Sequence, residues 1–443
     1  MMRQSTHRAV WRLAGPLIIS NTSIAILGMV DTAIVGHLDH PYYLGAVAVG
    51  AVIFDFLYWG MGFLRMGTTG VVAQIHGRRD HDEIRSSLLH AIAIALFFSL
   101  LFLLMQSPIS GIGLSLIGGS EEVTRYARVY FDWTIWGAPA VLSSMAIMGW
   151  LLGMQNAAAT LIMTVTINVI NVVLDFVFVF GLHMDVRGVA MASVIAQYAG
   201  LVTGSVLVCL ELRKHPGRWR TGSILNSRSF SSLLALNRNI FIRTVCLIFA
   251  FAFFTRQGAI QNDLILAANT VLINFLFLLS MALDGFANAT EALIGKAIGG
   301  SDRMAFNDAI RIAGGWSMVV AAIFSLIYGL AGKYLVDVMT NIDSVRMTAY
   351  EFLPWLVLLP LINVWCYFFD GVFFGATRGR ELRDMMIIST FLVYIPAWHF
   401  FQFLGNHGLW LAFSCFFAAR GLCLGIVYFR IEKYKGGFIP RAV

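Results

Sequence analysis

The stretch INVINVVLDFVFVF, residues 167–180, is almost entirely apolar, yet it carries Asn168, Asn171 and Asp175. Comparable apolar runs recur at roughly 12 places, each about 20 to 30 residues long, which is enough to cross about 30 Å of hydrocarbon as a helix. The chain of 443 residues is 58% hydrophobic and 12% charged, whereas about 25% charged residues are typical of a soluble domain. The sequence therefore predicts an all-α integral membrane protein.

The apolar runs predict twelve transmembrane helices. They are expected over residues 12–36, 43–74, 87–117, 124–154, 157–181, 187–212, 231–256, 263–297, 308–332, 345–376, 384–404 and 406–431. The first run is too long for a cleavable signal sequence, so we expect it to remain in the mature protein. All five cysteines lie within apolar runs, which predicts buried thiols and neither a disulfide nor a metal site.

Arginine and lysine gather in the loops on the side of the membrane that holds both termini. These loops lie around residues 78–85, 213–228, 296–311 and 378–383, and the tail at 430–435 is also basic. The positive-inside bias predicts that both termini lie in the cytoplasm, beneath a bacterial-type inner membrane. The net charge of +7 thus indicates topology, and we expect no nucleic-acid partner.

A polar stretch at the midpoint predicts a cytoplasmic linker, residues 213–230, between an N-terminal lobe, 1–212, and a C-terminal lobe, 231–443. The two lobes resemble each other at a constant shift of roughly 222 positions. The shift pairs Leu44 with Leu266, Thr68 with Thr290, Asp80 with Asp302, Gly149 with Gly371 and Gly153 with Gly375. Because six helices separate equivalent points, the repeats share their orientation. We therefore expect two pseudo-symmetric six-helix lobes around a central cleft.

An ionised carboxylate at the centre of a membrane helix costs about 2.5 to 3.5 kcal/mol to insert, so it rarely faces lipid. Asp175 shares one helix face with Asn171 and with the supporting Asn168. Asp31 lies about as far from the outer end of its helix as Asp175 does, so the two carboxyls are expected at one depth. If they face each other, desolvation and repulsion make the pair a proton acceptor, or the pair forms a cation cage with Asn171. A purely structural role in helix packing is the alternative.

Several other residues are weaker candidates. Pro16 removes a backbone hydrogen bond from the first helix and permits a bend, although a merely tolerated kink is an equal interpretation. Asp284 and Asp370 lie well inside helices of the second lobe and are candidates for a substrate or ion site. Other charges in apolar runs, Asp55 among them, are interpreted mainly as side chains that reach the interface from helix ends. The cluster HGRRDHDE, residues 76–83, lacks zinc-type spacing and predicts a solvated loop.

Taken together, the motifs resemble the multidrug and toxic compound extrusion (MATE) family, and most of all its DinF-like branch. The likeness rests on GMVDTAIVGHL (28–38), INVINVVLDFVFVFGL (167–182), GVAMAS (188–193) and a GxxRG-like element at 375–379, in a chain of two lobes. In that family an aspartate of helix 1 and an Asn and Asp of helix 5 form the cation-coupling site. The resemblance thus assigns these roles to Asp31, Asn171 and Asp175, and the helix 1 bend to Pro16. Ser193 stands where relatives often have Thr and keeps the hydroxyl.

The resemblance and the buried acids imply a proton-coupled multidrug antiporter. Protonation of the Asp31/Asp175 site is expected to drive rearrangement of the first helix and release of an amphipathic, often cationic, compound by alternating access. Sodium coupling at the same site and flipping of a lipid-linked precursor are the alternatives. No HExxH or GxSxG motif indicates an enzyme, and no filter-like loop indicates a channel. We expect drug-like small molecules and the bilayer as partners, a monomer, and no cofactor beyond the coupling H+ or Na+.

Overall fold

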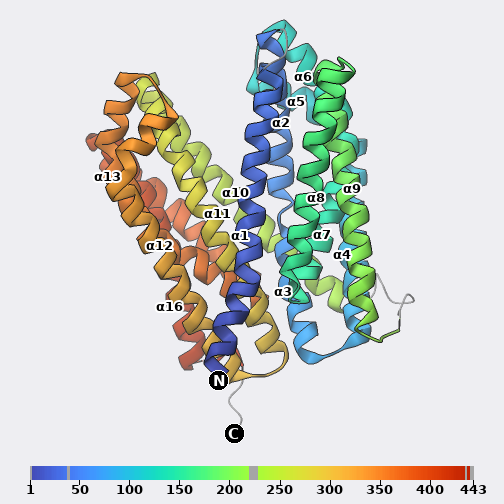
Figure 1. Cartoon of the computed structure of the whole chain (residues 1–443). Helices are drawn as coiled ribbons and strands as arrows, with labels where there is room; N and C mark the ends of the chain where they lie inside the picture. Colours follow the sequence, from blue (N-terminus) through green and yellow to red (C-terminus); the bar gives the residue numbers. More distant parts are fainter. Residues whose placement is uncertain (1, 37–39, 219–227, 435–436, 440–443) are drawn as a thin grey trace. The chain divides into compact units, whose positions relative to one another are not determined.

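The computed structural model describes residues 2–36, 40–218, 228–434 and 437–439. Within these ranges every regular element is helical (Figure 1), and 12 spans are long and apolar enough to cross a membrane. The prediction of an all-α membrane protein with twelve spans is therefore confirmed. Of the predicted linker, residues 219–227 lie outside the described residues.

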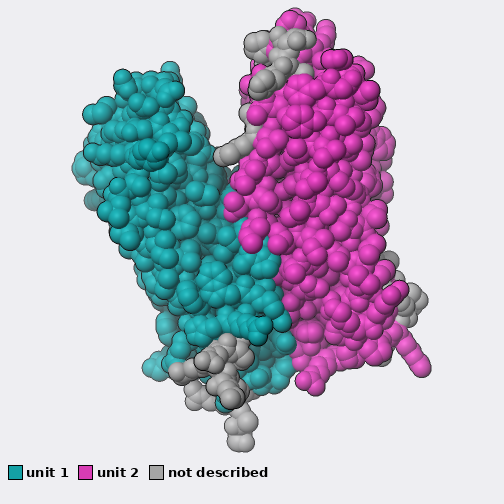
Figure 2. Space-filling model, viewed as in Figure 1, with its two compact units in different colours: residues 1–18, 235–443 teal, residues 19–234 magenta. Residues whose placement is uncertain are grey.

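The helices gather into two compact units, which Figure 2 colours separately. Unit 1 comprises residues 1–18 and 235–443, and unit 2 comprises residues 19–234. Helix α1 (Met2–Gly36) therefore contributes its first half to unit 1 and its second half to unit 2. Aromatic packing holds the first half of α1 in unit 1. The Trp11 ring contacts the rings of Phe286 and Trp316 edge-on, at centroid distances of 5.4 and 5.2 Å.

Unit 2 consists of the second half of α1 and the helices that follow it. These are α2 (Pro41–Gly60), α3 (Phe63–Arg78), α4 (His81–Leu104), α5 (Gln106–Ile117), α6 (Glu121–Thr134), the 3-10 turn η1 (Ile135–Gly137), α7 (Ala138–Gly153), α8 (Ala157–Asp175), the π-helical turn η2 (Phe176–Gly181) and α9 (Asp185–Arg213). Trp150 of α7 is fully buried in the core of this unit, where its indole nitrogen donates to the carbonyl of Ile84 at 3.0 Å.

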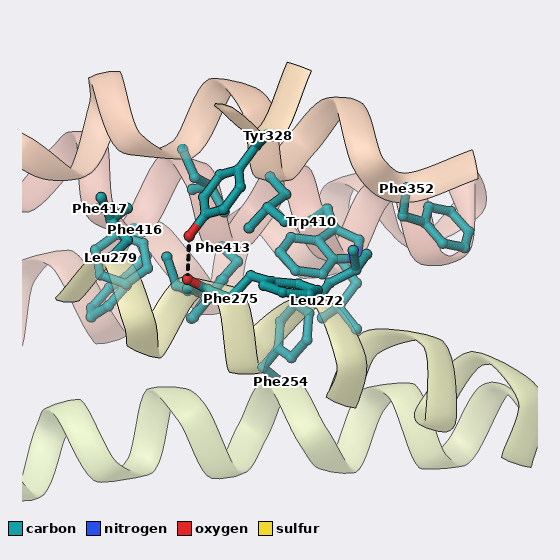
Figure 3. Packing of buried hydrophobic residues seen from close by; sticks show 14 of the residues in the cluster. Phe254, Leu272, Phe275, Leu279, Tyr328, Phe352, Trp410, Phe413, Phe416 and Phe417 are labelled. Atoms are coloured by element: carbon teal, nitrogen blue, oxygen red, sulfur yellow. Dashed lines mark hydrogen bonds between the residues drawn. The ribbon is translucent and has the colours of Figure 1, made fainter. Parts of the chain in front are cut away.

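Unit 1 contains the remaining helices around a core rich in aromatic side chains. They are α10 (Arg228–Gln261), which begins before the unit boundary, α11 (Asp263–Gly299), α12 (Arg303–Met339), α13 (Asp343–Gly375), α14 (Gly379–Ile387), the π-helical turn η4 (Ile388–Tyr394), α15 (Ile395–Phe401), the 3-10 turn η5 (Gln402–Leu404) and α16 (Asn406–Tyr434). Figure 3 shows Phe254, Trp410 and Phe413 packed together in this core. The buried Tyr328 hydroxyl donates to the carbonyl of Phe275 at 2.7 Å, so the one polar group of that ring has a partner (Figure 3).

The prediction of a single helix over residues 87–117 is wrong. The structure has a spanning helix, α4, that ends at Leu104, followed by a separate short helix, α5, that starts at Gln106. Pro108 lies in the first turn of α5 and has no N–H to offer the carbonyl of Leu104. The apolar run therefore ends one helix and starts another, although its hydropathy is continuous.

The segment 76–83 lies where α3 ends and α4 begins, and it is only partly solvated. A ring nitrogen of His81 is 3.3 Å from one of His215, which follows the end of α9. The guanidinium of Arg85 donates to the carbonyls of Leu212 and His215, both at 3.1 Å. Burial lowers the pKa of His215, so this ring is neutral at neutral pH. These contacts hold the start of α4 against the end of α9.

The internal repeat predicted from the sequence recurs in the backbone. Arg79 and its repeat equivalent Ser301 both adopt left-handed conformations, with φ of 59° and 52°. The next residue in each repeat, Asp80 or Asp302, caps the following helix by accepting a hydrogen bond from a backbone N–H three residues on. The two halves thus end one helix and begin the next in the same way.

The closest helix contacts are also repeated. A Cβ atom added at Gly149 would lie 2.4 Å from the carbonyl oxygen of Arg65, and one added at Gly371 would lie 2.4 Å from that of Ala287. Arg65 and Ala287 are themselves repeat equivalents. In each unit, therefore, a glycine lets two helix backbones touch at the same place, α7 on α3 and α13 on α11.

We expect Gly149→Ala and Gly371→Ala to destabilise the protein to a similar extent, by about 1–3 kcal/mol, since the added methyl meets backbone that has no rotamer to change. The measurement is the thermal unfolding midpoint in detergent. The matched control is Gly111→Ala in α5, where an added Cβ meets nothing within 4 Å. Equal midpoints for all three variants and the unmodified protein would show that these contacts are not tight.

Candidate functional site

Helices α1 and α8 bring the two predicted carboxyl groups together in unit 2. Asp31 lies in the second half of α1, and Asp175 is the last residue of α8. Their carboxyl groups lie within hydrogen-bonding range of one another. Asp175 is fully buried, whereas Asp31 is partly exposed. The structure therefore places side by side the two acids that the sequence predicted at one depth.

The side chain of Asn171 links the pair to α9. Because a carboxylate oxygen only accepts hydrogen bonds, the amide nitrogen of Asn171 faces Asp31 and donates to its Oδ1 at 3.1 Å. The amide oxygen then accepts from the hydroxyl of Ser193 at 3.2 Å. Asn171 and Ser193 thus both lie at the carboxyl pair, and the hydroxyl orients the amide towards Asp31.

The backbone changes character directly after Asp175. The α-helix gives way to the π-helical turn η2, in which the N–H of Leu182 bonds the carbonyl of Val177, five residues earlier, at 2.9 Å. Single π-helical turns inside α-helices occur frequently at functional sites. Asp175 Oδ1 is buried without a hydrogen-bond partner among the described residues. This oxygen is therefore available to a proton or a cation.

A seam of neutral hydrogen bonds holds the second half of α1 to α8. The hydroxyl of Ser20 donates to that of Thr164 at 2.7 Å, and the amide of Asn168 donates to the hydroxyl of Ser23 at 3.0 Å. Asn168 therefore supports the position of α1 and does not bond to the carboxyl pair. The hydroxyls of this seam carried no separate signal in the sequence, because serine and threonine are common inside membrane helices.

Pro16 lies in the half of α1 that belongs to unit 1. The helix continues through it from Met2 to Gly36, although proline leaves the carbonyl of Arg12 without its helical partner. The boundary between the two units falls after Ile18. The gap in the hydrogen-bond ladder of α1 is thus about one turn from the point where the helix passes from one unit to the other.

A cavity of about 240 Å³ lies beside Asp31 within unit 2. Its walls come from α1, α2, α6, α7, α8 and α9. The polar side chains that line it are Asp31, Asp55, Tyr58, Tyr130, Thr134, Asn171, Ser193 and Gln197. The carboxyl pair is therefore next to a space that is large enough for several water molecules, at about 30 Å³ each.

The acids of unit 1 have a different environment. Asp370 in α13 forms ion pairs with both Arg243 and Arg420, the latter at 2.8 Å, and all three side chains are buried. Asp284 lies in α11 within electrostatic range of the Tyr367 hydroxyl. Because two guanidinium groups already compensate Asp370, this carboxylate is poorly suited to a further cation. Its two ion pairs link α13 to α10 and α16.

Sequence reasoning missed Asp55 and Tyr130 as residues of the cavity. Asp55 is only five residues from the end of α2, but the span continues through the turn at 61–62 into α3, as far as Arg78. Counting its distance from both ends of the predicted helix 43–74 could have placed it inside the membrane. For Tyr130 no signal was available, because a tyrosine in an apolar run is usually part of the core.

Comparisons with known proteins agree with this architecture. The family model described as MatE matches residues 16–177 and 240–398. The chain is 41% identical over 438 residues to the DNA damage-inducible protein F of Escherichia coli (strain K12), covering 96% of this chain and 93% of that protein. It is 26% identical to a probable multidrug resistance protein NorM of Rhizobium meliloti (strain 1021), covering 97% and 94% of the two chains.

A solved structure described as the outward-facing conformation of a multidrug resistance MATE family transporter shares the fold. It superposes with a TM-score of 0.86 at 18% sequence identity, and 96% of each chain is covered. The family match in both halves, the close relative along almost the whole length and the two repeats of membrane helices all agree. The chain is a member of the MATE family of membrane transporters, and it is not an enzyme.

Proposed function

We propose that this MATE-family transporter is a proton-driven antiporter that exports amphipathic, often cationic, compounds across a bacterial inner membrane. The observation that carries the proposal is the pair Asp31 and Asp175, whose carboxyl groups lie within hydrogen-bonding range inside membrane-spanning helices. The relative described as a probable multidrug resistance protein supports the class of cargo.

The carboxyl pair is suited to bind and release one proton. Two carboxylates at this separation repel each other strongly where the dielectric constant is low, so both cannot readily be ionised. A single bound proton removes one negative charge and lets the two groups share a hydrogen bond. Among the described residues no arginine or lysine forms an ion pair with Asp31 or Asp175. A mobile cation is therefore the natural source of compensation.

Protonation at this site would weaken a hydrogen bond that holds α1 to α8. Asn171 donates to Asp31, and a hydrogen bond to a carboxylate weakens when the acceptor becomes neutral. The bonds of Ser20 and Ser23 that remain between α1 and α8 are neutral, and each contributes only about 0.5–1.5 kcal/mol. We infer that protonation releases the second half of α1 to repack, with the gap at Pro16 as the place where the helix bends. The repacking would displace cargo from the cavity.

Sodium is the second candidate ion, since the free Oδ1 of Asp175 and the oxygens of Asn171 and Ser193 are hard ligands. Sodium, however, prefers several oxygens at once, whereas the amide oxygen of Asn171 already accepts from Ser193. Because Asn171 donates a hydrogen bond to Asp31, its amide nitrogen faces the carboxyl pair and its oxygen points away from it. This arrangement favours the proton.

Asp31→Asn and Asp175→Asn are each expected to lower gradient-driven efflux by about tenfold or more, because coupling between two sites typically amounts to a factor of about 5–150. Uptake of a fluorescent cation into inverted membrane vesicles, in which an exporter transports inwards, measures the effect. The matched control is Asp132→Asn, which changes an exposed aspartate in α6, inside another membrane span. This variant should keep the transport rate of the unmodified protein. Undiminished efflux in either site variant, at equal protein content, contradicts the assignment.

In proteoliposomes, a pH gradient alone should drive counter-transport of the cation, and a sodium gradient at constant pH should not. The physical reason is that the pair holds one proton through a shared hydrogen bond but offers sodium too few free oxygens. Transport with the sodium gradient alone, lost in Asp175→Asn, would assign the site to sodium. Transport of a lipid without either gradient would favour a flippase.

We further propose that both termini face the cytoplasm, which the basic loops on that side support. A green fluorescent protein fused to the carboxyl terminus should then fluoresce, and alkaline phosphatase fused there should be inactive. Alkaline phosphatase fused after Gly119, between α5 and α6, should be active because that loop lies outside. The reverse pattern would invert the proposed orientation.

A further inference from the structure

Asp55 stands in the middle of a membrane span without compensation. It lies 14 residues after Pro41, the first residue of α2, which corresponds to about 21 Å along the helix. Across the described residues, no hydrogen bond or ion pair reaches its carboxylate, and the side chain is exposed. An unpaired carboxylate at such depth costs several kcal/mol, about 2.5–3.5 on insertion scales. Such a group is expected to have a partner that is bound only part of the time.

The carboxyl of Asp55 faces the same cavity as Asp31, but it is not part of the carboxyl pair. Tyr130, whose side chain is buried, lines this cavity together with Asp31 and Asp55. A Cβ atom at Gly50 would lie 2.3 Å from the Tyr130 ring, so this glycine makes the room that the ring occupies against α2. The cavity is therefore lined by two acidic side chains and by the ring of Tyr130.

The walls around Asp55 are aromatic. Phe54 and Tyr58 line the cavity beside it and stack on one another with ring centroids 5.6 Å apart. The hydroxyl of Tyr58 is buried and has no hydrogen-bond partner among the described residues. A carboxylate beside aromatic faces is the arrangement that binds organic ammonium groups, through charge and cation–π attraction. Aromatic faces do not stabilise a proton bound to a carboxyl group, and a sodium ion requires more oxygen ligands than this site offers.

The size of the cavity limits what can enter. Its volume of about 240 Å³ is below the roughly 300–1,000 Å³ of pockets that hold whole drug-sized molecules. It is large enough for the positively charged end of such a compound, with the remainder outside the cavity. Gln197 of α9 adds an amide to the lining for a polar substituent.

We propose that Asp55, with Phe54, Tyr58 and Tyr130, forms a subsite for the cationic head of the exported compound, separate from the Asp31/Asp175 pair that binds the coupling ion. The inference rests on the proposed export of cationic compounds and adds where their charge is recognised. Because Asp31 and Asp55 line one cavity, a cation at Asp55 and a proton at the pair repel each other. Competition between cargo and proton thus has an electrostatic basis.

The test is equilibrium binding of benzyltrimethylammonium, a permanently charged cation with a compact quaternary ammonium head, to the purified full-length protein in detergent without any gradient. Asp55→Asn should weaken binding by about tenfold or more, the loss expected when a desolvated charge partner is removed. Asp55→Glu keeps the charge and should retain most of the affinity. Asp31→Asn should bind the cation with at least the normal affinity, and the exposed Asp132→Asn is the control.

The outcomes separate this inference from the proposed function. Normal cation binding in Asp55→Asn overturns the subsite but leaves proton coupling at the pair intact. If Asp55→Asn loses pH-driven efflux of every cargo while cation binding is unchanged, the subsite is also overturned. Asp55 would then take part in proton transfer. No cation binding to the unmodified protein overturns the proposed cargo class, and the subsite with it. Folding of each variant is checked by its thermal unfolding midpoint.

Discussion

Charge compensation in a medium without water is the constraint on which this structure depends. Each ionisable group inside the membrane needs a fixed partner, an exchangeable partner or a proton. Asp370 has fixed partners, two buried arginines from neighbouring helices. Among the described residues, Asp31 and Asp175 have only each other and an amide as partners. The difference divides these three acids into one that links helices through ion pairs and two that have no basic partner among the described residues.

This division follows the two units. The repeat gives both units the same turns and the same close glycine contacts, so their backbones are built alike. Their polar interiors are not alike, because buried Asp370 of unit 1 is paired with two arginines, whereas Asp31 and Asp55 line the cavity of unit 2 without an ion pair among the described residues. The duplicated scaffold thus carries a cluster of ion pairs in one unit and a cavity lined by acids in the other.

Helix α1 is the element in which these features meet. Its second half carries Asp31 and is held to α8 by weak neutral bonds, and its first half packs through Trp11 in unit 1. Pro16 removes a hydrogen bond about one turn before the boundary between units. Asp31 thus lies in a helix whose second half is held by neutral hydrogen bonds and whose hydrogen-bond ladder is interrupted at Pro16.

The sequence by itself determined the class of the protein and its twelve spans, and it predicted the repeat and the acids of the candidate site. It could do so because hydropathy over about 20 residues sets the number of spans, and because a helical period of 3.6 residues places Asn171 and Asp175 on one face. The break between α4 and α5 escaped this reasoning, since hydropathy does not register one missing hydrogen bond at Pro108.

Only the tertiary structure decided which charges are compensated and by what. Arg243, Arg420 and Asp370 come from three helices far apart in the sequence, and no local pattern reports that they meet. The same holds for Asp55 and Tyr130, which share a cavity with Asp31 because α1, α2 and α6 all contribute to its walls. Periodicity fixes the face on which a side chain lies, but the partner across that face depends on how helices pack, and packing is a property of the whole fold.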